Sequence, residues 1–403
     1  MGQPTVLISG AGVAGTSLAH WLTEYGYRAV VVETAPTLRL GGQTVDLRGA
    51  GRDVITRMGL LDEMRARSLD QRGIAWVRGN GRRRAEMPVD AFDGNGMVSA
   101  LEILRGDLVE VLYNATSARA EYRFGTRITE IDSSGATLSD GTRVDADLIV
   151  GADGPHSSVR RMVFGPEEQY VTLLGGYNAW FTAPDTAGLD GWYLMYQAPG
   201  LNASMRPSHD PALCKAGLAF RSGPVDYDRR DPATQLALLN THFAGAGWHC
   251  ADLLAAAAVA DDFYFDAFLQ VHMPTLSRGP VTLVGDAGYC ASPLSGMGTS
   301  LALVGAYVLA GELGPADVFA HAKLGLALSR YESTMRPYIE RCQDLPTGID
   351  GYLPKSALDI TIYTQVMKWM QRWPIRSYAG RKWFTTADAI QLPSYPAASQ
   401  HKW

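Results

Sequence analysis

The sequence predicts a mixed α/β fold built from three parts. A parallel sheet with helices comes first, an antiparallel sheet lies in the middle, and the C-terminal end is helical. Three observations support this. The first 33 residues read as strand, glycine-rich turn, helix and strand; residues 175–222 hold short aromatic strands between Pro, Gly and Asp turns; and long apolar helical stretches follow residue 293.

The N-terminal segment forms a βαβ unit. Thr5–Ser9 is an apolar strand, Ala14–Tyr25 has helical spacing, and Arg28–Val32 is a β-branched strand that ends at Glu33. Because consecutive strands joined through a helix lie parallel, this order predicts the start of a parallel sheet.

The loop Gly10-Ala11-Gly12-Val13-Ala14-Gly15 joins this first strand to its helix. Gly10 permits a tight turn, Gly12 lets the backbone approach a pyrophosphate, and Gly15 lets the helix pack on the strand. The helix N-terminus, which includes Ala14, offers unpaired N–H groups to phosphates. Glu33 follows Gly15 at the spacing expected of a ribose-binding acid. The loop therefore predicts a bound dinucleotide.

The next part of the chain alternates helices and short strands. After a glycine-rich stretch, residues 40–51, helical sequence is expected through Arg67, and Ile103–Ala115 reads as an amphipathic helix. Strands are expected at Ile74–Val77, Ala85–Pro88, Tyr122–Phe124, Arg127–Asp132, Gly135–Leu138 and Arg143–Ala152.

The middle of the chain predicts an antiparallel sheet that can wall a pocket. The expected strands of this sheet are Tyr177–Thr182, Trp192–Gln197, Ala203–Arg206 and Lys215–Arg221. Helices are expected at Asp231–Phe243 and Cys250–Val259, and a further strand, Tyr264–His272, returns the chain to Pro280–Gly285. A flat apolar substrate needs stacking area, although sheet aromatics also serve as core. The candidate pocket walls are Trp180, Tyr193, Tyr196, Met205 and Phe220.

Composition excludes several classes of protein. The 403-residue chain is 46% apolar and 19% charged, with a net charge of −5, so nothing favours nucleic acid. The four cysteines, Cys214, Cys250, Cys290 and Cys342, form no CxxC pair, which argues against a metal site and favours buried, reduced thiols. No leader or membrane-length apolar run is visible, so a cytoplasmic location is expected.

A second glycine-rich constellation lies late in the chain. Gly285-Asp286-Ala287 follows an apolar strand, and Pro293 precedes Gly296-Met297-Gly298-Thr299, which opens the helix Thr299–Leu313. The aspartate can accept hydrogen bonds from a polyol chain. The helix N-terminus suits the negative charge of a reduced flavin ring. An ordinary loop remains the alternative for this stretch taken alone.

In these residues the chain resembles the class A flavoprotein monooxygenases, which have the p-hydroxybenzoate hydroxylase fold. The glycine loop is similar to the family's first FAD motif. Gly151-Ala152-Asp153-Gly154, followed by Ser157-Ser158-Val159-Arg160, resembles the second, and Gly285-Asp286-Ala287 with Pro293 resembles the third. The resemblance covers residues 4–315 and is greatest to tetracycline-modifying and aromatic polyketide monooxygenases.

The resemblance implies roles for several charged residues. Glu33 is expected at the adenosine ribose, Asp286 at the ribityl or pyrophosphate region, and Arg105 on FAD. Asp153 is expected to serve FAD and NAD(P)H together. Arg39 and Asp46 match an NADPH-contacting arginine and a flavin-contacting aspartate.

The chain departs from the family at two positions. Gly288-Tyr289 stands where the third motif commonly reads Ala-His, and Ser300 replaces a frequent asparagine. Both substitutions bear on how the flavin is positioned.

The resemblance also implies a domain organisation. A discontinuous Rossmann-like FAD-binding domain would comprise residues 1–75, 98–175 and 273–325, and a β-sheet substrate domain residues 76–97 and 176–272. A helix is expected at Asp317–Arg341, and residues 326–403 would form a C-terminal helical segment that bridges the two domains. Its basic, tryptophan-containing stretch Gln365–Trp383 favours a helix docked across the domains over a membrane-surface contact.

The function implied is FAD-dependent monooxygenation of an aromatic or polycyclic phenolic substrate, tetracycline- or polyketide-like, with NAD(P)H and O₂. A flavin C4a-hydroperoxide would carry the oxygen atom, and no side chain stands out as catalytic. Two alternatives stay open: a FAD-dependent dehydrogenase or reductase without oxygen insertion, and a flavoprotein without turnover. A monomer or weak oligomer is expected.

Overall fold

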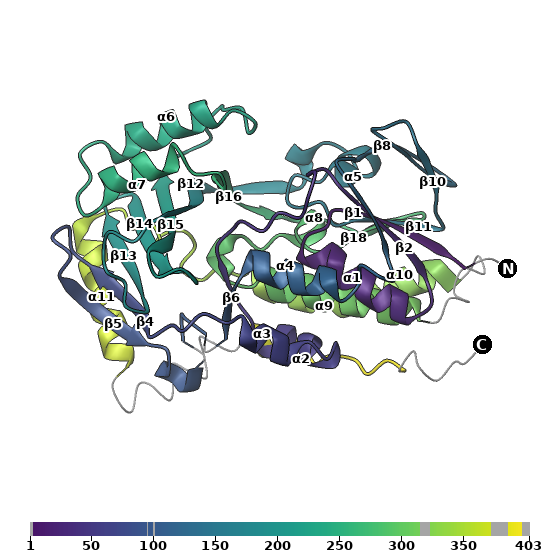
Figure 1. Cartoon of the computed structure of the whole chain (residues 1–403), viewed down its shortest axis with the longest axis horizontal. Coiled ribbons are helices and arrows are strands. Elements are labelled where there is room, and N and C mark those ends of the chain that lie inside the picture. The colour runs from purple at the N-terminus through teal and green to yellow at the C-terminus, as the bar shows by residue number, and fades with distance from the viewer. Residues whose placement is uncertain (1–2, 95, 100, 315–322, 372–385, 397–403) are drawn as a thin grey trace.

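The computed structural model describes residues 3–94, 96–99, 101–314, 323–371 and 386–396. Two large sheets lie side by side (Figure 1). The first has six strands in the order β17-β18-β11-β1-β2-β7, all parallel except for β17. Their bounds are β1 (Thr5–Ser9), β2 (Arg28–Glu33), β7 (Glu121–Phe124), β11 (Leu148–Gly151), β17 (Ser277–Arg278) and β18 (Val281–Leu283).

Helices pack along the six-stranded sheet because their apolar sides bury against it. The helices α1 (Val13–Glu24) and α9 (Gly298–Leu313) lie together, and α10 (Lys323–Gln343) packs on α9. Thirteen of the 16 residues of α9 are buried, which explains why its sequence is apolar on all sides. The other members of this region are α2 (Gly49–Arg57), α3 (Leu61–Ala66), α4 (Arg105–Asn114), α5 (Ser158–Val163) and a three-stranded sheet of β8 (Ile128–Asp132), β9 (Gly135–Leu138) and β10 (Arg143–Asp145).

The second sheet has seven strands in the order β16-β12-β15-β14-β13-β4-β5. Neighbours are antiparallel, as predicted, except that β13 and β4 are parallel. The bounds are β4 (Gly73–Val77), β5 (Arg83–Pro88), β12 (Val171–Pro184), β13 (Trp192–Ala198), β14 (Leu201–Pro207), β15 (Leu213–Arg221) and β16 (Tyr264–Val271). The helices α6 (Pro232–Phe243) and α7 (Cys250–Ala257) cover one face, and α11 (Ala357–Met370) packs against β5 and β13.

A small connection joins the two regions. The strands β3 (Thr44–Asp46) and β6 (Glu102–Leu104) pair with each other between the large sheets, and β12 runs from one region into the other. The described chain also contains the short helix α8 (Asp286–Tyr289) and the 3-10 turns η1 (Ala91–Gly94), η2 (Glu167–Gln169), η3 (Pro293–Ser295) and η5 (Thr386–Asp388). The three domain boundaries stay a prediction.

The structure corrects two expected elements. Ile103–Ala115 is not one helix, because residues 102–104 pair as β6 with β3 and the helix begins at Arg105. Arg143–Ala152 is two strands, β10 and β11, with a break at residues 146–147. There the Asp147 carboxylate accepts a 2.8 Å hydrogen bond from the Thr5 amide.

The four cysteines are buried, as predicted. Among the described residues, no helix has the length and apolar character needed to cross a membrane. Most of the basic stretch Gln365–Trp383 lies outside the described residues, as does the start of the helix expected at Asp317–Arg341. The bridging role of that stretch, the cytoplasmic location and the oligomeric state stay predictions.

Candidate active site

The three glycine- and aspartate-containing motifs converge although they lie far apart in the sequence. A Cβ at Gly10 would lie 2.5 Å from the Ala152 carbonyl oxygen, so the first motif touches the second. A Cβ at Gly285 would lie 2.9 Å from that of Ala14, so the third motif touches the first. Each contact requires a residue without a side chain, and both glycines have a positive φ, +106° and +64°.

The first loop has the form of a phosphate cradle. A Cβ at Gly15 would overlap the Gly10 carbonyl, which explains why the helix can approach the strand only there. The space beside Gly12 is open, with nothing within 4 Å of the Cβ position. Among the described residues, no side chain caps the N-terminus of α1 at Gly12. The N–H groups of the first turn are therefore available to an anionic group.

Glu33, Arg39 and Arg105 surround the entrance of this loop. The Glu33 carboxylate accepts hydrogen bonds from the amides of Ala11 at 3.0 Å and Ala35 at 2.8 Å, and it lies 3.7 Å from the Arg39 guanidinium. Arg105 donates to the Gly41 carbonyl at 2.6 Å. These residues line one hollow together with Ala11, Gly12, Leu38 and Val109. The structure thus brings together three of the predicted cofactor residues with the glycine loop.

Asp153 has a local role in the structure. Its carboxylate accepts hydrogen bonds from the Ser157 hydroxyl and from the amide and hydroxyl of Ser158, both at 2.8 Å, so it caps α5. Arg160 in that helix is fully buried and donates to the Ala287 carbonyl at 2.8 Å, which links the second motif to the third. A direct contact of Asp153 with a cofactor stays a prediction.

Asp286 lies beside the N-terminus of α9. A Cβ at Gly298 would be 3.9 Å from the Asp286 Oδ1 atom. Burial raises the pKa of the Asp286 carboxyl above its ordinary value, and the nearby charge of Asp266 also raises it. Pro293 opens the turn η3, and Gly296 follows it in the left-handed conformation, φ +64°, so the loop can turn back into α9.

The two departures from the family pattern have packing explanations. The Tyr289 hydroxyl lies against Gly305 so closely that a Cβ there would overlap it, and it is 3.1 Å from the Tyr331 hydroxyl. A Cβ at Gly51 would be 2.7 Å from the Ser300 hydroxyl, so α2 and α9 leave room for only a short side chain. Both substitutions fit the close packing of α9.

The face of the seven-stranded sheet opposite α6 and α7 is polar and buried. Within the described chain, seven buried side-chain atoms on β12, β13 and β14 have no hydrogen-bond partner. Register places them on one face, because Asn178 and Asn202 oppose Ala219, and Trp180 and Ser204 oppose Gly217. The atoms are Asn178 Oδ1, Trp180 Nε1, Tyr193 Oη, Gln197 Oε1, Asn202 Oδ1, Ser204 Oγ and Arg206 Nε.

The third motif meets this polar face. Leu294, within η3, packs with Ala219, Phe268 and Leu353, and Ala219 shares the face of Asn178. A loop preceding α11 also covers part of it through its main chain. The Asn202 amide donates to the Tyr352 carbonyl at 3.2 Å, Gln197 to the same carbonyl at 3.1 Å, and Arg221 to the Leu353 carbonyl at 2.6 Å.

The structure corrects three of the five predicted pocket residues. Tyr196, Met205 and Phe220 point to the opposite face, where they join the apolar core that includes Leu239 and Leu253 of α6 and α7. Met205 and Phe220 are fully buried there. Trp180 and Tyr193 lie on the polar face, as a pocket role requires. The polar residues of β14, which alternate with Met205, were missed although their spacing of two was visible.

A buried cluster of charged side chains closes one end of the polar face. The Arg206 guanidinium stacks 4.0 Å from the Tyr193 ring centre, donates to the Thr44 hydroxyl at 2.6 Å and lies 3.8 Å from Glu102. Asp46 pairs with Arg48 in the same cluster. Burial and then the neighbouring Asp46 charge raise the pKa of Glu102 well above its ordinary value.

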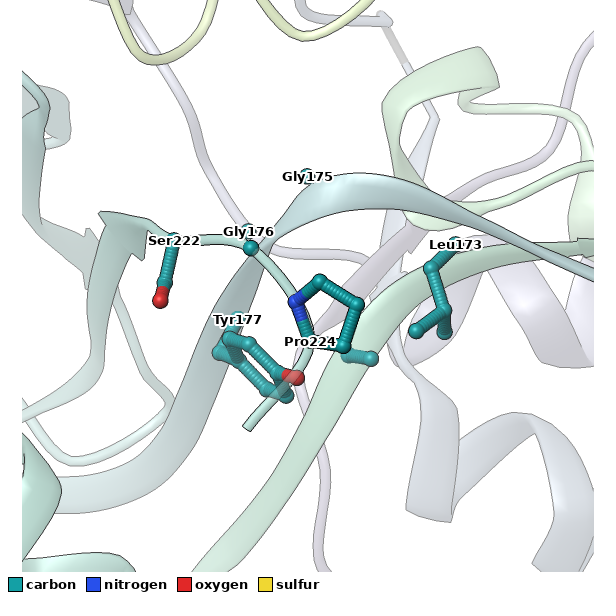
Figure 2. Close-up of a pocket in the computed structure, with 8 residues that line it drawn as sticks. Leu173, Gly175, Gly176, Tyr177, Ser222 and Pro224 are labelled. Atoms are coloured by element: carbon teal, nitrogen blue, oxygen red, sulfur yellow. The ribbon is translucent and has the colours of Figure 1, made fainter. Parts of the chain in front are cut away.

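A separate hollow of about 100 Å³ lies where β12 bulges between Leu173 and Tyr177 (Figure 2). Gly175, Ser222 and Pro224 also line it. Its volume is far below the ~300–1,000 Å³ of typical ligand pockets, so the hollow by itself cannot hold a multi-ring substrate.

The residues present fit FAD. A long dinucleotide needs an open glycine loop at a helix N-terminus and an acid at the end of the second strand, and the chain has both. The N-terminus of α9, beside Asp286, would offer a second helix dipole to the flavin end. The described residues contain no group of His, Cys, Asp and Glu side chains able to hold a metal ion. The fold and these motifs define a flavoprotein.

Comparison with known proteins specifies the family. A model of the FAD binding domain matches residues 3–344. An uncharacterised protein of Mycobacterium tuberculosis is 42% identical over 356 residues, which cover 87% of this chain and 95% of that protein. The FAD-dependent monooxygenase asL4 of Sarocladium schorii is 34% identical and covers 98% of this chain and 99% of its own. The crystal structure of tetracycline destructase Tet(51) superimposes with a TM-score of 0.80 at 31% identity, over 98% of this chain and 99% of that one.

The chain therefore belongs to the FAD-binding-domain family and is one of its flavoprotein monooxygenases.

Proposed function

We propose that this enzyme uses NAD(P)H and O₂ to hydroxylate an oxygen-rich aromatic or polycyclic phenolic substrate, bound between the FAD cradle and the polar face of the seven-stranded sheet. The observation that carries the proposal is the set of seven buried polar atoms on that face that have no partner among the described residues. Buried polar groups cost free energy unless they are paired, so such a set is typical of a site that a ligand completes.

The chemistry of these atoms defines the kind of substrate. Trp180 and Arg206 offer N–H donors, whereas Asn178, Gln197 and Asn202 offer amide oxygens that accept. A substrate carrying both carbonyl and hydroxyl groups on a flat ring system would satisfy both kinds. The similarity to tetracycline destructase Tet(51) supports a multi-ring phenolic compound.

Different residues would bind different parts of FAD. We infer that the α1 N-terminus holds the pyrophosphate, with Glu33 at the adenosine ribose and Arg39 and Arg105 at the cradle entrance, where NAD(P)H can reach. Asp286 and the N-terminus of α9 would face the flavin end. Bound FAD would take electrons from NAD(P)H and activate O₂. The protein would position the flavin ring and exclude water.

The Glu102 and Arg206 cluster would hold charge close to the substrate. Neither Glu102 oxygen has a hydrogen-bond partner in the described chain, and the side chain is 1% exposed. Burial and the neighbouring Asp46 charge raise the pKa of Glu102 well above its ordinary value, which favours the protonated carboxyl, the form that can donate a hydrogen bond to a substrate oxygen.

The decisive experiment measures where the oxygen atom goes. Purified enzyme with FAD, NADPH and ¹⁸O₂ is incubated with tetracycline and with a panel of polyhydroxylated anthraquinones. The masses of the products are then measured by mass spectrometry. The proposal expects substrate-dependent NADPH oxidation and one ¹⁸O atom in the product. Oxidised product without ¹⁸O would instead support the dehydrogenase alternative, and tight FAD binding with no stimulated NAD(P)H oxidation would support a flavoprotein without turnover.

A further inference from the structure

The imidazole of His156 lies between two carboxylates from separate parts of the chain. Its Nδ1 atom is 2.9 Å from Oε1 of Glu167, in the turn η2, and its Nε2 atom is 3.0 Å from Oδ2 of Asp266, in β16. His156 itself follows the Asp153-Gly154-Pro155 turn of the second motif. One ring therefore joins the FAD-binding region to the seven-stranded sheet.

Only the charged form of the ring satisfies both contacts. Carboxylates accept hydrogen bonds, and a neutral imidazole has a single N–H to donate, whereas the imidazolium has two. Burial by itself would lower the pKa of His156, but the hydrogen bonds to Asp266 and Glu167 outweigh it and raise the pKa above its ordinary value.

Other polar side chains also contact the two carboxylates. Glu167 also accepts from Arg229 at 2.8 Å and lies 3.8 Å from Arg160. Burial would raise the pKa of Glu167, yet His156 and Arg229 together lower it to about 2. Asp266 accepts a 2.8 Å hydrogen bond from the Tyr264 hydroxyl, and its further charged or titratable neighbours are Tyr227, Arg229, Asp286 and Cys290.

The contact of His156 with Glu167 and Asp266, here called the His156 joint, connects two parts of the candidate site. On one side, residues 151–155 carry the carbonyl of Ala152 against which Gly10 packs. On the other side, Asp266 and Tyr264 lie on the polar face, opposite Asn178 and Trp180. His156 is therefore placed between the segment that packs on the glycine loop and the polar face of the seven-stranded sheet.

We propose that His156, as the imidazolium, is a positioning residue that holds the FAD cradle against β16, and that its deprotonation weakens FAD binding. The inference rests on FAD occupying the cradle described above. Because both partners are carboxylates, the charged imidazolium is the form that holds the contact. The affinity for FAD is therefore highest below the pKa of the His156 imidazole in the folded protein, and it falls as the pH rises through that pKa.

The test is the dissociation constant of FAD between pH 6 and 10, read from the fluorescence released when flavin leaves the protein. For wild type we expect the constant to rise about 10- to 100-fold across the transition, the effect of losing a charge-assisted hydrogen bond. His156→Gln should bind FAD weakly at every pH with a flat profile. The matched control His249→Gln, at the start of α7 on the far side of the second sheet, should follow wild type.

A second variant tests the joint without removing the ring. Asp266→Asn takes away one carboxylate, so the transition should move to lower pH, a shift that a merely structural role would not produce. If wild type binds FAD tightly with no pH dependence, or if the pH of the transition is the same in Asp266→Asn, the role of His156 is wrong but the proposed function stands. Absence of FAD binding at every pH would overturn the proposed function with it.

Discussion

The two faces of the seven-stranded sheet come from the same strands, yet they differ in how their side chains are satisfied. The face toward α6 and α7 is a closed apolar core, which includes Phe181, Met205 and Phe220. The opposite face buries seven polar atoms without partners in the described chain. Since burial of an unpaired polar group is unfavourable, the first face stabilises the fold and the second suits the binding role proposed for it.

The largest expected effect comes from the apolar face. Phe220→Ala removes a fully buried ring and should lower the free energy of unfolding by about 3–5 kcal/mol, measured by urea denaturation. The KM of the folded protein should change little. A loss of substrate affinity larger than the loss of stability would contradict the division between the faces.

The charged cluster should give the next largest effect. Arg206→Met removes the cation beside Glu102 and should cost about 2–4 kcal/mol of unfolding free energy at pH 8. The pKa of Glu102 is already raised, so the folded state binds the extra proton and the stability of the variant should fall as pH rises. Denaturation at pH 5 and pH 8 measures this, and the double variant Arg206→Met/Glu102→Gln should lose the pH dependence.

A smaller change is expected where an unpaired atom is removed. Ser204→Ala deletes a buried hydroxyl without a partner in the described chain, so the free energy of unfolding should stay within about 1 kcal/mol of wild type or increase. The KM for the substrate should rise about threefold to tenfold because one hydrogen bond is lost. Ala203→Ser, its neighbour on the apolar face, serves as the control and should show the reverse pattern: lower stability and an unchanged KM.

The last prediction concerns reactivity. Cys214 and Cys250 belong to the apolar face, and burial raises the pKa of each thiol to about 12. Both should therefore resist a thiol-specific disulfide reagent at pH 8 in the native enzyme and react fully after unfolding in urea. Rapid labelling of either thiol in the native enzyme would show that this face is open to solvent.

The local chemistry of the chain predicts much of the FAD region. The glycine loop, Glu33 and the third motif each depend on residues close in sequence, and the structure brings them together. The break at Asp147 and the strand at residues 102–104 could not be predicted in the same way, because each depends on a partner elsewhere, Thr5 and β3.

The pocket could be predicted only in part. A period of two divides a strand into two sets of side chains but does not say which set faces the cofactor. Trp180 and Met205 belong to opposite sets, and only the register between β12, β14 and β15 assigns them. Likewise, nothing in the spacing of His156, Glu167 and Asp266 indicates that one ring would meet both acids, since β16 lies about a hundred residues beyond the second motif.

The loop before α11 is hydrogen-bonded to the polar face through the main-chain carbonyl groups of the loop. Gln197, Asn202 and Arg221 all donate to main-chain oxygens of residues 352–353. Every amino acid supplies such an oxygen, so these hydrogen bonds do not depend on which side chains the loop carries, whereas the buried side chains of Ile349 and Leu353 hold it by packing. Substitutions at the exposed positions of the loop can therefore change its surface without disturbing these main-chain hydrogen bonds.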